Sequence, residues 1–192
     1  MRTDSGRVVE CKVKGNFRLR GIRSTNPVAV GDGVTLTEPE ADGGAAFITE
    51  IDERRNYIVR KASNLSKQSH VLAANVDLAL LVVTVARPAT TTTFIDRFLA
   101  SAEAYRVPVA IAFNKADDWQ PAEAGEAESL RTLYSGIGYE CFRISALRGE
   151  GVEALAQLLA GKVTLLAGHS GVGKSTLLNS LVPGAGAGMD DM

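Results

Sequence analysis

The stretch Gly168-His169-Ser170-Gly171-Val172-Gly173-Lys174-Ser175 decides how this chain of 192 residues is interpreted. Its spacing, G-x-x-x-x-G-K-S, is that of the phosphate-binding P-loop. The apolar run at residues 163–167 predicts a buried strand before the loop, and the leucines at 177, 178 and 181 predict a helix after it. Backbone N–H groups in such a loop, together with the helix N-terminus, bind phosphate oxygens. The alternative is a glycine-rich turn in an unrelated fold, which the flanking strand and helix disfavour.

The end of this stretch carries its expected chemistry. Lys174 is predicted to reach the β- and γ-phosphates of a nucleotide, and the Ser175 hydroxyl is predicted to bind Mg²⁺. We therefore take Lys174 and Ser175 as the candidate catalytic residues. The whole stretch 168–175 and the following Thr176 are the candidate phosphate-binding residues.

The second half of the chain alternates between apolar runs and amphipathic segments. This alternation predicts a largely parallel sheet with helices on both faces. Ligands bind such sheets at the carboxyl ends of their strands. The predicted strands are residues 76–85, 107–113, 139–145 and 163–167, and the predicted helices are residues 94–106, 123–137, 151–160 and 176–181.

Two short motifs follow predicted strands of this sheet. Asn114-Lys115-Ala116-Asp117 fits N-K-x-D, which selects guanine because one carboxylate accepts hydrogen bonds from both N1–H and the exocyclic amine. Adenine would leave the Asp117 carboxylate unpaired, and unpaired buried polar groups give large discrimination. Lys115 is expected to lie along the base and Asn114 to link this loop to the P-loop. Ser145-Ala146 resembles the S-A loop, in which the N–H of Ala146 would meet guanine O6. Each motif alone could be an ordinary turn, but together with the P-loop they predict a site for GTP or GDP.

The first part of the chain has a different pattern. Short β-like runs at residues 7–13, 17–22, 33–37, 46–51 and 57–60, separated by glycine-rich turns, predict a small OB-type barrel, and an SH3-like barrel fits nearly as well. Up to residue 68 there are 12 Lys and Arg against 9 Asp and Glu, a balance that fits a polyanionic partner and an ordinary solvated basic face equally well. Aromatic residues are few, so we expect contacts with a nucleic-acid backbone rather than with bases. The candidate nucleic-acid-binding residues, which the resemblance given below makes candidate RNA-binding residues, are Arg18, Arg20, Arg23, Arg54, Arg55, Arg60 and Lys61.

These patterns divide the chain into an OB-like barrel at residues 1–62, a polar linker at 63–73 and an α/β nucleotide-binding domain at 74–192. A hydrophobic content of 45% and a charged content of 22% are typical of globular proteins. We find no apolar run long enough for a membrane span and no signal-peptide pattern. Cys11 and Cys141 are far apart and are expected to be reduced. The expectation is a cytoplasmic protein without a membrane partner.

The order of the motifs is N-K-x-D, S-A, P-loop, a circular permutation of the order in ordinary small GTPases. A permuted GTPase domain after a basic barrel resembles the small-ribosomal-subunit-dependent GTPase family of the RsgA/YjeQ type. The resemblance implies a monomeric GTPase that the 30S subunit activates, that acts late in 30S maturation and that contacts 16S rRNA. The alternative is a GTP-gated RNA-binding assembly factor of another permuted family, in which hydrolysis only resets binding. Further supporting segments are Leu19-Arg20-Gly21-Ile22-Arg23, Val30-Gly31-Asp32, Arg55-Asn56-Tyr57-Ile58-Val59-Arg60, Ala74-Asn75-Val76-Asp77 and Ile95-Asp96-Arg97-Phe98-Leu99.

Some parts that the resemblance implies are not found in these 192 residues. After Leu181 the sequence is glycine-rich and contains neither a switch I threonine nor a D-x-x-G strand. The C-terminal Cys/His module of the family, which holds one zinc ion, is also absent, and Cys11 and Cys141 cannot replace it. We therefore expect the sequence as given to bind nucleotide weakly and to hydrolyse it negligibly.

Overall fold

The computed structural model of the chain describes residues 1–13, 27–37, 45–61 and 69–183, without the side chains of residues 60, 61, 69 and 70. The chain divides into two compact units, Met1–Asn75 and Val76–Met192. Each unit has its own sheets, and we describe each separately.

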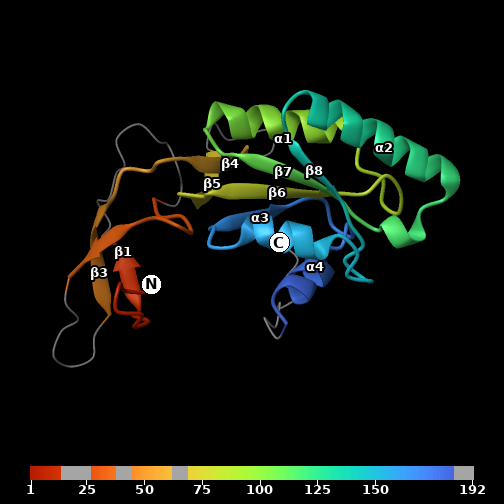
Figure 1. The fold of residues 1–192 in the computed structure, drawn as a ribbon. Coiled ribbons are helices and arrows are strands. Elements are labelled where there is room, and N and C mark those ends of the chain that lie inside the picture. Colours follow the sequence, from red (N-terminus) through yellow and green to blue (C-terminus); the bar gives the residue numbers. More distant parts are fainter. Residues whose placement is uncertain (14–26, 38–44, 62–68, 184–192) are drawn as a thin grey trace. The chain divides into compact units, whose positions relative to one another are not determined.

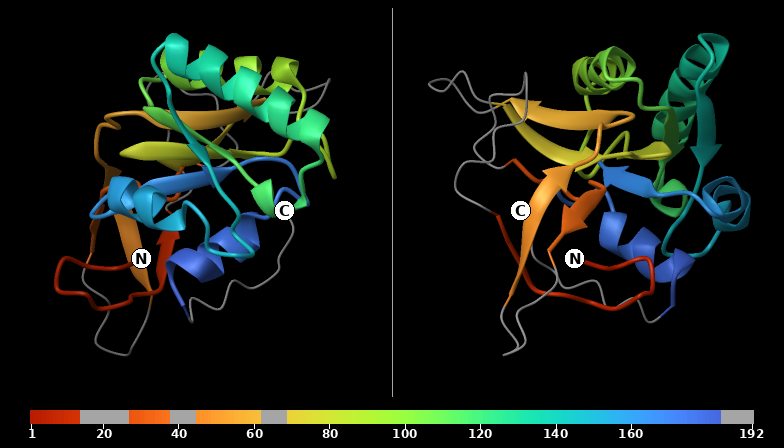
Figure 2. Two further views of the ribbon diagram at one scale, coloured as in Figure 1. Left: turned by 45° about the vertical axis from the view of Figure 1, so that its right-hand side comes forward. Right: turned by 90° about the vertical axis from the view of Figure 1, so that its left-hand side faces the viewer.

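The second unit contains a four-stranded parallel sheet in the order β8-β7-β6-β9. Its strands are β6 (Leu78–Val83), β7 (Val109–Phe113), β8 (Glu140–Arg143) and β9 (Thr164–Ala167). Helices α1 (Thr92–Ala104) and α2 (Pro121–Gly136) cover one face, whereas α3 (Val152–Leu159) and α4 (Lys174–Leu181) lie on the other, as Figures 1 and 2 show. The α/β class predicted from the alternating pattern is therefore confirmed.

The core of this unit explains the apolar runs in the sequence. All residues of β6 are buried, because helices cover both faces of the sheet. On the α3–α4 side, Leu80 and Val82 pack with Leu155 of α3 and Leu177 of α4, all four of them fully buried. Val172 of the P-loop belongs to the same cluster and is also fully buried. The hydrophobic core thus extends into the loop that defines the candidate site.

Capping side chains set the starts of two helices. The hydroxyl of Thr91 accepts a hydrogen bond from the N–H of Phe94 at 3.3 Å, so α1 begins at Thr92. Gln120 and Glu123 form a reciprocal capping box, and Pro121 occupies the first turn of α2. A single 3₁₀ turn, η1 (Ala116–Asp118), connects the end of β7 to this helix.

The first unit has two small sheets among its described residues. Strand β3 (Ala46–Ile51) pairs in parallel with β1 (Cys11–Val13) and antiparallel with β2 (Val34–Leu36). Strands β4 (Tyr57–Lys61) and β5 (Ser69–Ala74) form an antiparallel pair. The predicted strand at residues 17–22 lies outside the described residues, so the closed barrel stays a prediction.

The predicted linker differs from the structure in its second half. Residues 69–73, expected to be linker, belong to β5, which pairs with β4 from Tyr57↔Ala74 to Lys61↔Ser69. This pairing satisfies the backbone N–H and C=O groups that a linker would leave to water. The boundary between the two units follows at Asn75, immediately after the strand.

Among the described residues, no helix combines the length and the apolar character that crossing a bilayer requires.

Candidate nucleotide-binding site

The predicted motifs meet at one edge of the parallel sheet of the second unit. Strands β9, β7 and β8 are parallel and continue into the P-loop, the Asn114–Asp117 loop and the Ser145-Ala146 loop, respectively. Because the carboxyl ends of parallel strands share one edge, loops distant in sequence lie next to each other. The strand order thus places the P-loop, the Asn114–Asp117 loop and the Ser145-Ala146 loop side by side, which the sequence motifs alone do not show.

Close packing fixes the P-loop against β6. Gly168 has φ +139°, and a Cβ atom at this position would lie 2.3 Å from the carbonyl oxygen of Val82. Glycine is therefore required at the point where the loop leaves β9. Helix α4 begins at Lys174, directly after Gly173, so its N-terminus faces the loop. The Nζ atom of Lys174 donates to the carbonyl oxygens of Gly168 at 2.9 Å and His169 at 2.7 Å.

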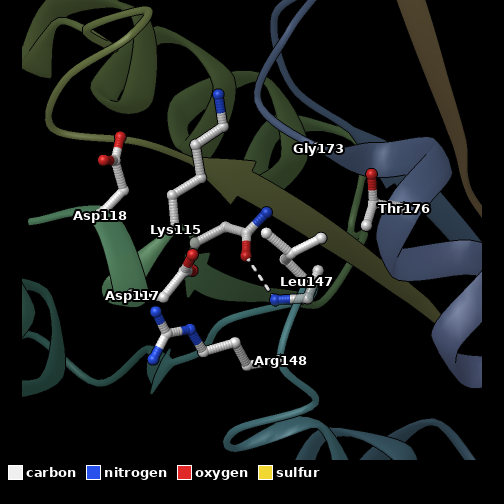
Figure 3. A pocket seen from close by; sticks show the side chains of 9 residues that line it. Lys115, Asp117, Asp118, Leu147, Arg148, Gly173 and Thr176 are labelled. Carbon is white, nitrogen blue, oxygen red and sulfur yellow. Dashed lines mark hydrogen bonds between the residues drawn. The ribbon is translucent and has the colours of Figure 1, made fainter.

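Asn114 joins the three loops. Its Nδ2 donates to the carbonyl oxygen of Val172 in the P-loop at 2.8 Å. Its Oδ1 accepts from the N–H of Ala146 at 2.9 Å, and this second hydrogen bond is the dashed line in Figure 3. Asn114 is 2% exposed, so both hydrogen bonds are shielded from water. A Cβ atom at Gly173 would lie 2.5 Å from Nδ2, which explains the glycine there. The predicted link between Asn114 and the P-loop is confirmed.

The same hydrogen bond involves the N–H that the sequence predicts to meet guanine O6. In this structure, the N–H of Ala146 donates to Asn114 Oδ1. The amide of Asn114 has one donor and one acceptor end, and both are needed to hold two loops at once. The N–H of Ala146 therefore helps to hold the loops together, and its contact with guanine stays a prediction.

Asp117 is held as an ionised carboxylate. The hydroxyl of Ser145 donates to its Oδ1, and this hydrogen bond is the main reason that the pKa of Asp117 is lowered. The nearby charges of Arg148 and Lys115 lower the same pKa further. Ser145 is fully buried, and its Oγ also accepts from the N–H of Arg148 at 3.1 Å. Ser145 thus fixes the orientation of the carboxylate, which acts only as an acceptor when ionised.

Arg87 is a residue of this site that the sequence did not indicate. It lies between β6 and α1, and its guanidinium binds Asp118 and Glu123 on the segment that follows Asp117. Its carbonyl oxygen accepts from Nζ of Lys115. No local motif distinguishes this arginine, because its partners lie 31 and 36 residues away.

The loops enclose a cavity of about 410 Å³. Figure 3 shows the carboxylate of Asp117 and the guanidinium of Arg148 on one side, with Gly173 and Thr176 on the other. The volume falls within the range of about 300–1,000 Å³ typical of small-molecule sites. Three of the lining residues, Asp118, Leu147 and Arg148, were not predicted, although the last two directly follow Ser145-Ala146. The predicted residues that line it are Asn114, Lys115, Asp117, Ala146, Gly173 and Thr176.

The other predicted residues lie around this cavity. Ser145 and Val172 are fully buried, so their side chains pack in the interior beneath the loops and do not line the cavity. The imidazole of His169 packs against the ring of Phe94 in α1, with ring centroids 3.9 Å apart. Ala116 is half-buried in η1, and its N–H donates to the carbonyl oxygen of Ile144 at 3.0 Å. Gly168, Ser170, Gly171, Lys174 and Ser175 belong to the P-loop and the start of α4.

The hydroxyl oxygens at the start of α4 suit a Mg²⁺ ion whose other ligands are phosphate oxygens and water. Ser175 and Thr176 are exposed in the first turn of α4, and their hydroxyls are hard oxygen ligands. Among the described residues, no group of three or more His, Cys, Asp and Glu side chains could hold a metal ion.

The predicted RNA-binding residues have different surroundings. Arg54 differs from the prediction: its side chain is 6% exposed and binds Asp32, so it is not available to RNA. Arg55 lies in the loop before β4 and is exposed, and its Nη2 donates to the carbonyl oxygen of Asn75 at 3.1 Å. Arg60 and Lys61 lie in β4, and Arg18, Arg20 and Arg23 fall outside the described residues.

Comparison with known proteins agrees with this geometry. The family model "RsgA GTPase" matches residues 51–191. A protein named small ribosomal subunit biogenesis GTPase RsgA, from Bacteroides fragilis, is 65% identical over 96% of this chain and 59% of its own length. A relative from Bacteroides thetaiotaomicron, named RsgA 2, is 60% identical over the same shares. The chain therefore spans about three fifths of the length of the curated relatives it matches.

Two solved structures have the same fold. The crystal structure of YjeQ from Thermotoga maritima is 35% identical, with a TM-score of 0.71 over 94% of this chain and 59% of that one. The structure of YloQ, described as a circularly permuted GTPase, is 30% identical, with a TM-score of 0.61 over 92% of this chain and 56% of that one. The family model covers all three motifs, which meet where Asn114 joins their loops. The chain therefore belongs to the RsgA GTPase family.

Proposed function

We propose that the second unit binds guanine nucleotides in the cavity between Asp117 and the start of α4. The observation that carries the proposal is the pair of hydrogen bonds by which Asn114 holds the phosphate loop and both base loops together. The base-selecting and phosphate-binding groups are thereby fixed before a ligand arrives. Pre-organisation of this kind lowers the entropy lost on binding.

The roles of the groups follow from their positions. The ionised carboxylate of Asp117 accepts hydrogen bonds from guanine N1–H and the exocyclic amine. The P-loop backbone and the N-terminus of α4 bind the phosphates. Lys174 exchanges its two carbonyl acceptors in the loop for phosphate oxygens, which are charged and therefore form stronger hydrogen bonds. Mg²⁺, held through Ser175, would supply further charge neutralisation at the phosphates.

Nucleotide selectivity tests this assignment. Asp117→Asn leaves only one acceptor for guanine and adds a donor that suits the C2 carbonyl of xanthine. We expect GDP affinity to fall by about ten- to a hundredfold, because buried hydrogen-bonding groups lose their partners. XDP affinity should rise in the same variant. Calorimetric titration measures both, and the chain's single tryptophan, Trp119, gives a fluorescence signal next to the site. Unchanged GDP preference in the variant would exclude Asp117 as the guanine-selecting group.

We further propose that the longer protein is a GTPase in the maturation of the small ribosomal subunit. The relatives named for this role match the chain over nearly its whole length. The first unit, as an OB-like barrel, would contact 16S rRNA through the cationic residues other than Arg54. GTP turnover by the longer protein, measured with and without 30S subunits, tests this role. The expected result is faster turnover with the subunits, and an unchanged rate would contradict it.

A further inference from the structure

The segment between β6 and α1, residues 84–91, is closed on itself by hydrogen bonds and is called the β6–α1 loop below. The N–H of Thr90 donates to the carbonyl oxygen of Thr84 at 2.8 Å, and the N–H of Thr84 donates to Oγ1 of Thr90 at 3.2 Å. Both threonines are buried, and the hydroxyl of Thr84 donates to the carbonyl oxygen of Pro88. These bonds fix the loop at both ends, so it can serve as an anchor for its neighbours.

Arg87 presents its whole guanidinium from this loop to the segment that carries Asp117. Nε donates to Oδ2 of Asp118 at 2.8 Å, and Nη2 donates to the carbonyl oxygen of the same residue at 2.6 Å. Nη1 and Nη2 each donate to one carboxylate oxygen of Glu123, both at 2.7 Å. Asp118 is the residue after Asp117, and Glu123 caps the start of α2. The guanidinium therefore holds the chain on the carboxyl-terminal side of Asp117.

The backbone of Arg87 holds the other side of Asp117. Its carbonyl oxygen accepts a hydrogen bond from Nζ of Lys115, two residues before Asp117. Lys115 has φ +65°, a left-handed conformation that a lysine rarely adopts without external contacts. One residue thus contacts the guanine-selecting loop both before and after the carboxylate, without contacting the carboxylate itself.

The loop needs such external contacts because its own hydrogen bonding is slight. Residues Ala116–Asp118 form a single 3₁₀ turn, in which the N–H of Asp118 donates to the carbonyl oxygen of Lys115 at 3.0 Å. Short 3₁₀ turns have poor hydrogen-bond geometry and little cooperativity. A planar guanidinium bound to two carboxylates loses little entropy when it orders its partners. Two-point recognition of guanine requires the Asp117 carboxylate in one orientation, so the clamp acts directly on selectivity.

We propose that Arg87 is a positioning residue for guanine selection: through Asp118, Glu123 and Lys115 it fixes the orientation of the Asp117 carboxylate toward the base. This inference rests on the proposed nucleotide site and deepens it. Recognition of the base and positioning of the recognising group are then separate tasks. Asp117, oriented by Ser145, recognises the base, and Arg87 holds the 3₁₀ turn that contains Asp117.

The test compares nucleotides that differ in the group that Asp117 reads. GDP offers both N1–H and the exocyclic amine, whereas IDP lacks the amine. Affinities for both are measured by calorimetry with the full chain, with Arg87→Ala and with the matched control Arg131→Ala. Arg131 also binds a carboxylate with two nitrogens, Glu128 at 3.0 and 2.7 Å, but on the surface of α2 and away from the cavity.

We expect Arg87→Ala to lower the ratio of GDP to IDP affinity by about tenfold, mostly by weakening GDP binding. Arg131→Ala should leave both affinities unchanged. A general loss of folding would weaken both nucleotides alike, so the ratio reports on the orientation of Asp117. Arg87→Lys, which keeps the charge but lacks the planar fork, should recover less than half of the lost selectivity on a logarithmic scale.

Other outcomes overturn the proposal. If Arg87→Ala binds GDP and IDP with the unaltered ratio, the clamp does not set selectivity. The same conclusion follows if Arg131→Ala lowers the ratio equally, because the effect would then come from surface charge. If Arg87→Ala fails to fold, Asp118→Ala decides, since it removes one partner of the clamp and leaves the Arg87–Glu123 pair. If the unaltered chain binds neither nucleotide, the proposed function itself fails, which is a different result from binding without a change in selectivity.

Discussion

Two arginines, one in each unit, have nearly the same contacts but very different surroundings. Arg54 of the first unit binds both carboxylate oxygens of Asp32 at 2.7 Å and the carbonyl oxygen of Pro27 at 3.0 Å. Arg87 of the second unit binds two carboxylates and the carbonyl oxygen of Asp118. The side chains of Arg54 and Asp32 are 6% and 0% exposed, whereas those of Arg87 and Asp118 are 48% and 56% exposed.

The difference shows that burial determines whether an ion pair bears on the stability of the fold. Moving a charge out of water costs free energy, so removing one partner of a buried pair leaves the other buried with an uncompensated charge. An exposed pair gains little stability, because water competes for its charges and salt screens them. The Arg54 pair therefore bears on folding of the first unit, while the Arg87 clamp bears on the position of a loop. The predictions below test this division.

The largest effect is expected for Arg54→Ala. The substitution leaves the carboxylate of Asp32 buried with its charge uncompensated, although the N–H of Ala29 still donates to it at 2.7 Å. Loss of one partner of a buried pair costs about 3–5 kcal/mol. Urea unfolding, followed by NMR signals of residues in β3 and β4 of the first unit, measures the change. A loss below about 1 kcal/mol would mean that water reaches the pair and that the comparison with Arg87 fails.

A smaller effect is expected when both charges are removed together. Arg54→Met combined with Asp32→Asn retains an acceptor for the N–H of Ala29 and leaves no isolated charge. Replacing a buried pair by neutral side chains of similar volume is often neutral in stability. The double variant should therefore recover at least about 2 kcal/mol of the loss caused by Arg54→Ala. A double variant as unstable as the single one would show that packing of the guanidinium, and not the stranded charge, carries the effect. Recovery is also expected because Nη1 of Arg54 is buried without a hydrogen-bond partner among the described residues, so the double variant removes an unsatisfied buried donor.

The sequence predicted the second unit well because its signals are strong and local. A continuous apolar run identified β6, and each motif was assigned to the strand that precedes it. Errors were confined to element ends, where specific side chains decide. Strand β6 ends at Val83 rather than at residue 85, because Thr84 turns to hydrogen-bond with Thr90. Helix α4 begins at Lys174 rather than at residue 176, directly after the glycine of the P-loop.

What the sequence could not predict depends on contacts between distant residues. The pairing of β5 with β4 was missed because Ser69 and His70 gave this strand a polar start that is typical of a linker. Arg54 was assigned to RNA because its charge is visible in the sequence, whereas Asp32, 22 residues earlier, is not marked as its partner. Arg87 was missed for the same reason. The role of an arginine such as Arg54 or Arg87 therefore becomes clear only when the structure shows which carboxylate it binds.

A still smaller effect, on titration rather than on folding, is expected at Glu123. The hydrogen bonds from Arg87 lower the pKa of Glu123 from 4.5 to about 2, with a further contribution from the N–H of Gln120. Because the pKa in the folded state is the lower one, the associated stability is present above about pH 4.5 and is lost as the pH falls toward 2. In Arg87→Ala the pKa of Glu123 should rise most of the way back to 4.5. Carbon-13 chemical shifts of the glutamate carboxyls between pH 3 and 7 measure this change. A Glu123 signal that titrates near 4.5 in the unaltered chain would mean that the clamp is not formed in solution.

The smallest effect is expected for Arg131→Ala, and its smallness is what makes the comparison informative. Arg131 and Glu128 are exposed by 39% and 57% and lie three residues apart on α2, where the helix already holds both backbones in place. The pair is as well formed as the Arg87 clamp, with N–O distances of 3.0 and 2.7 Å. It joins two residues of one helix, whose positions the helix backbone already fixes. We therefore expect no measurable change in the urea midpoint or in nucleotide affinity. Arg87 instead joins segments 31 and 36 residues apart, so its loss releases a loop even though its exposure is similar. If Arg131→Ala and Arg87→Ala behave alike in both measurements, sequence separation does not distinguish a positioning ion pair from a surface one.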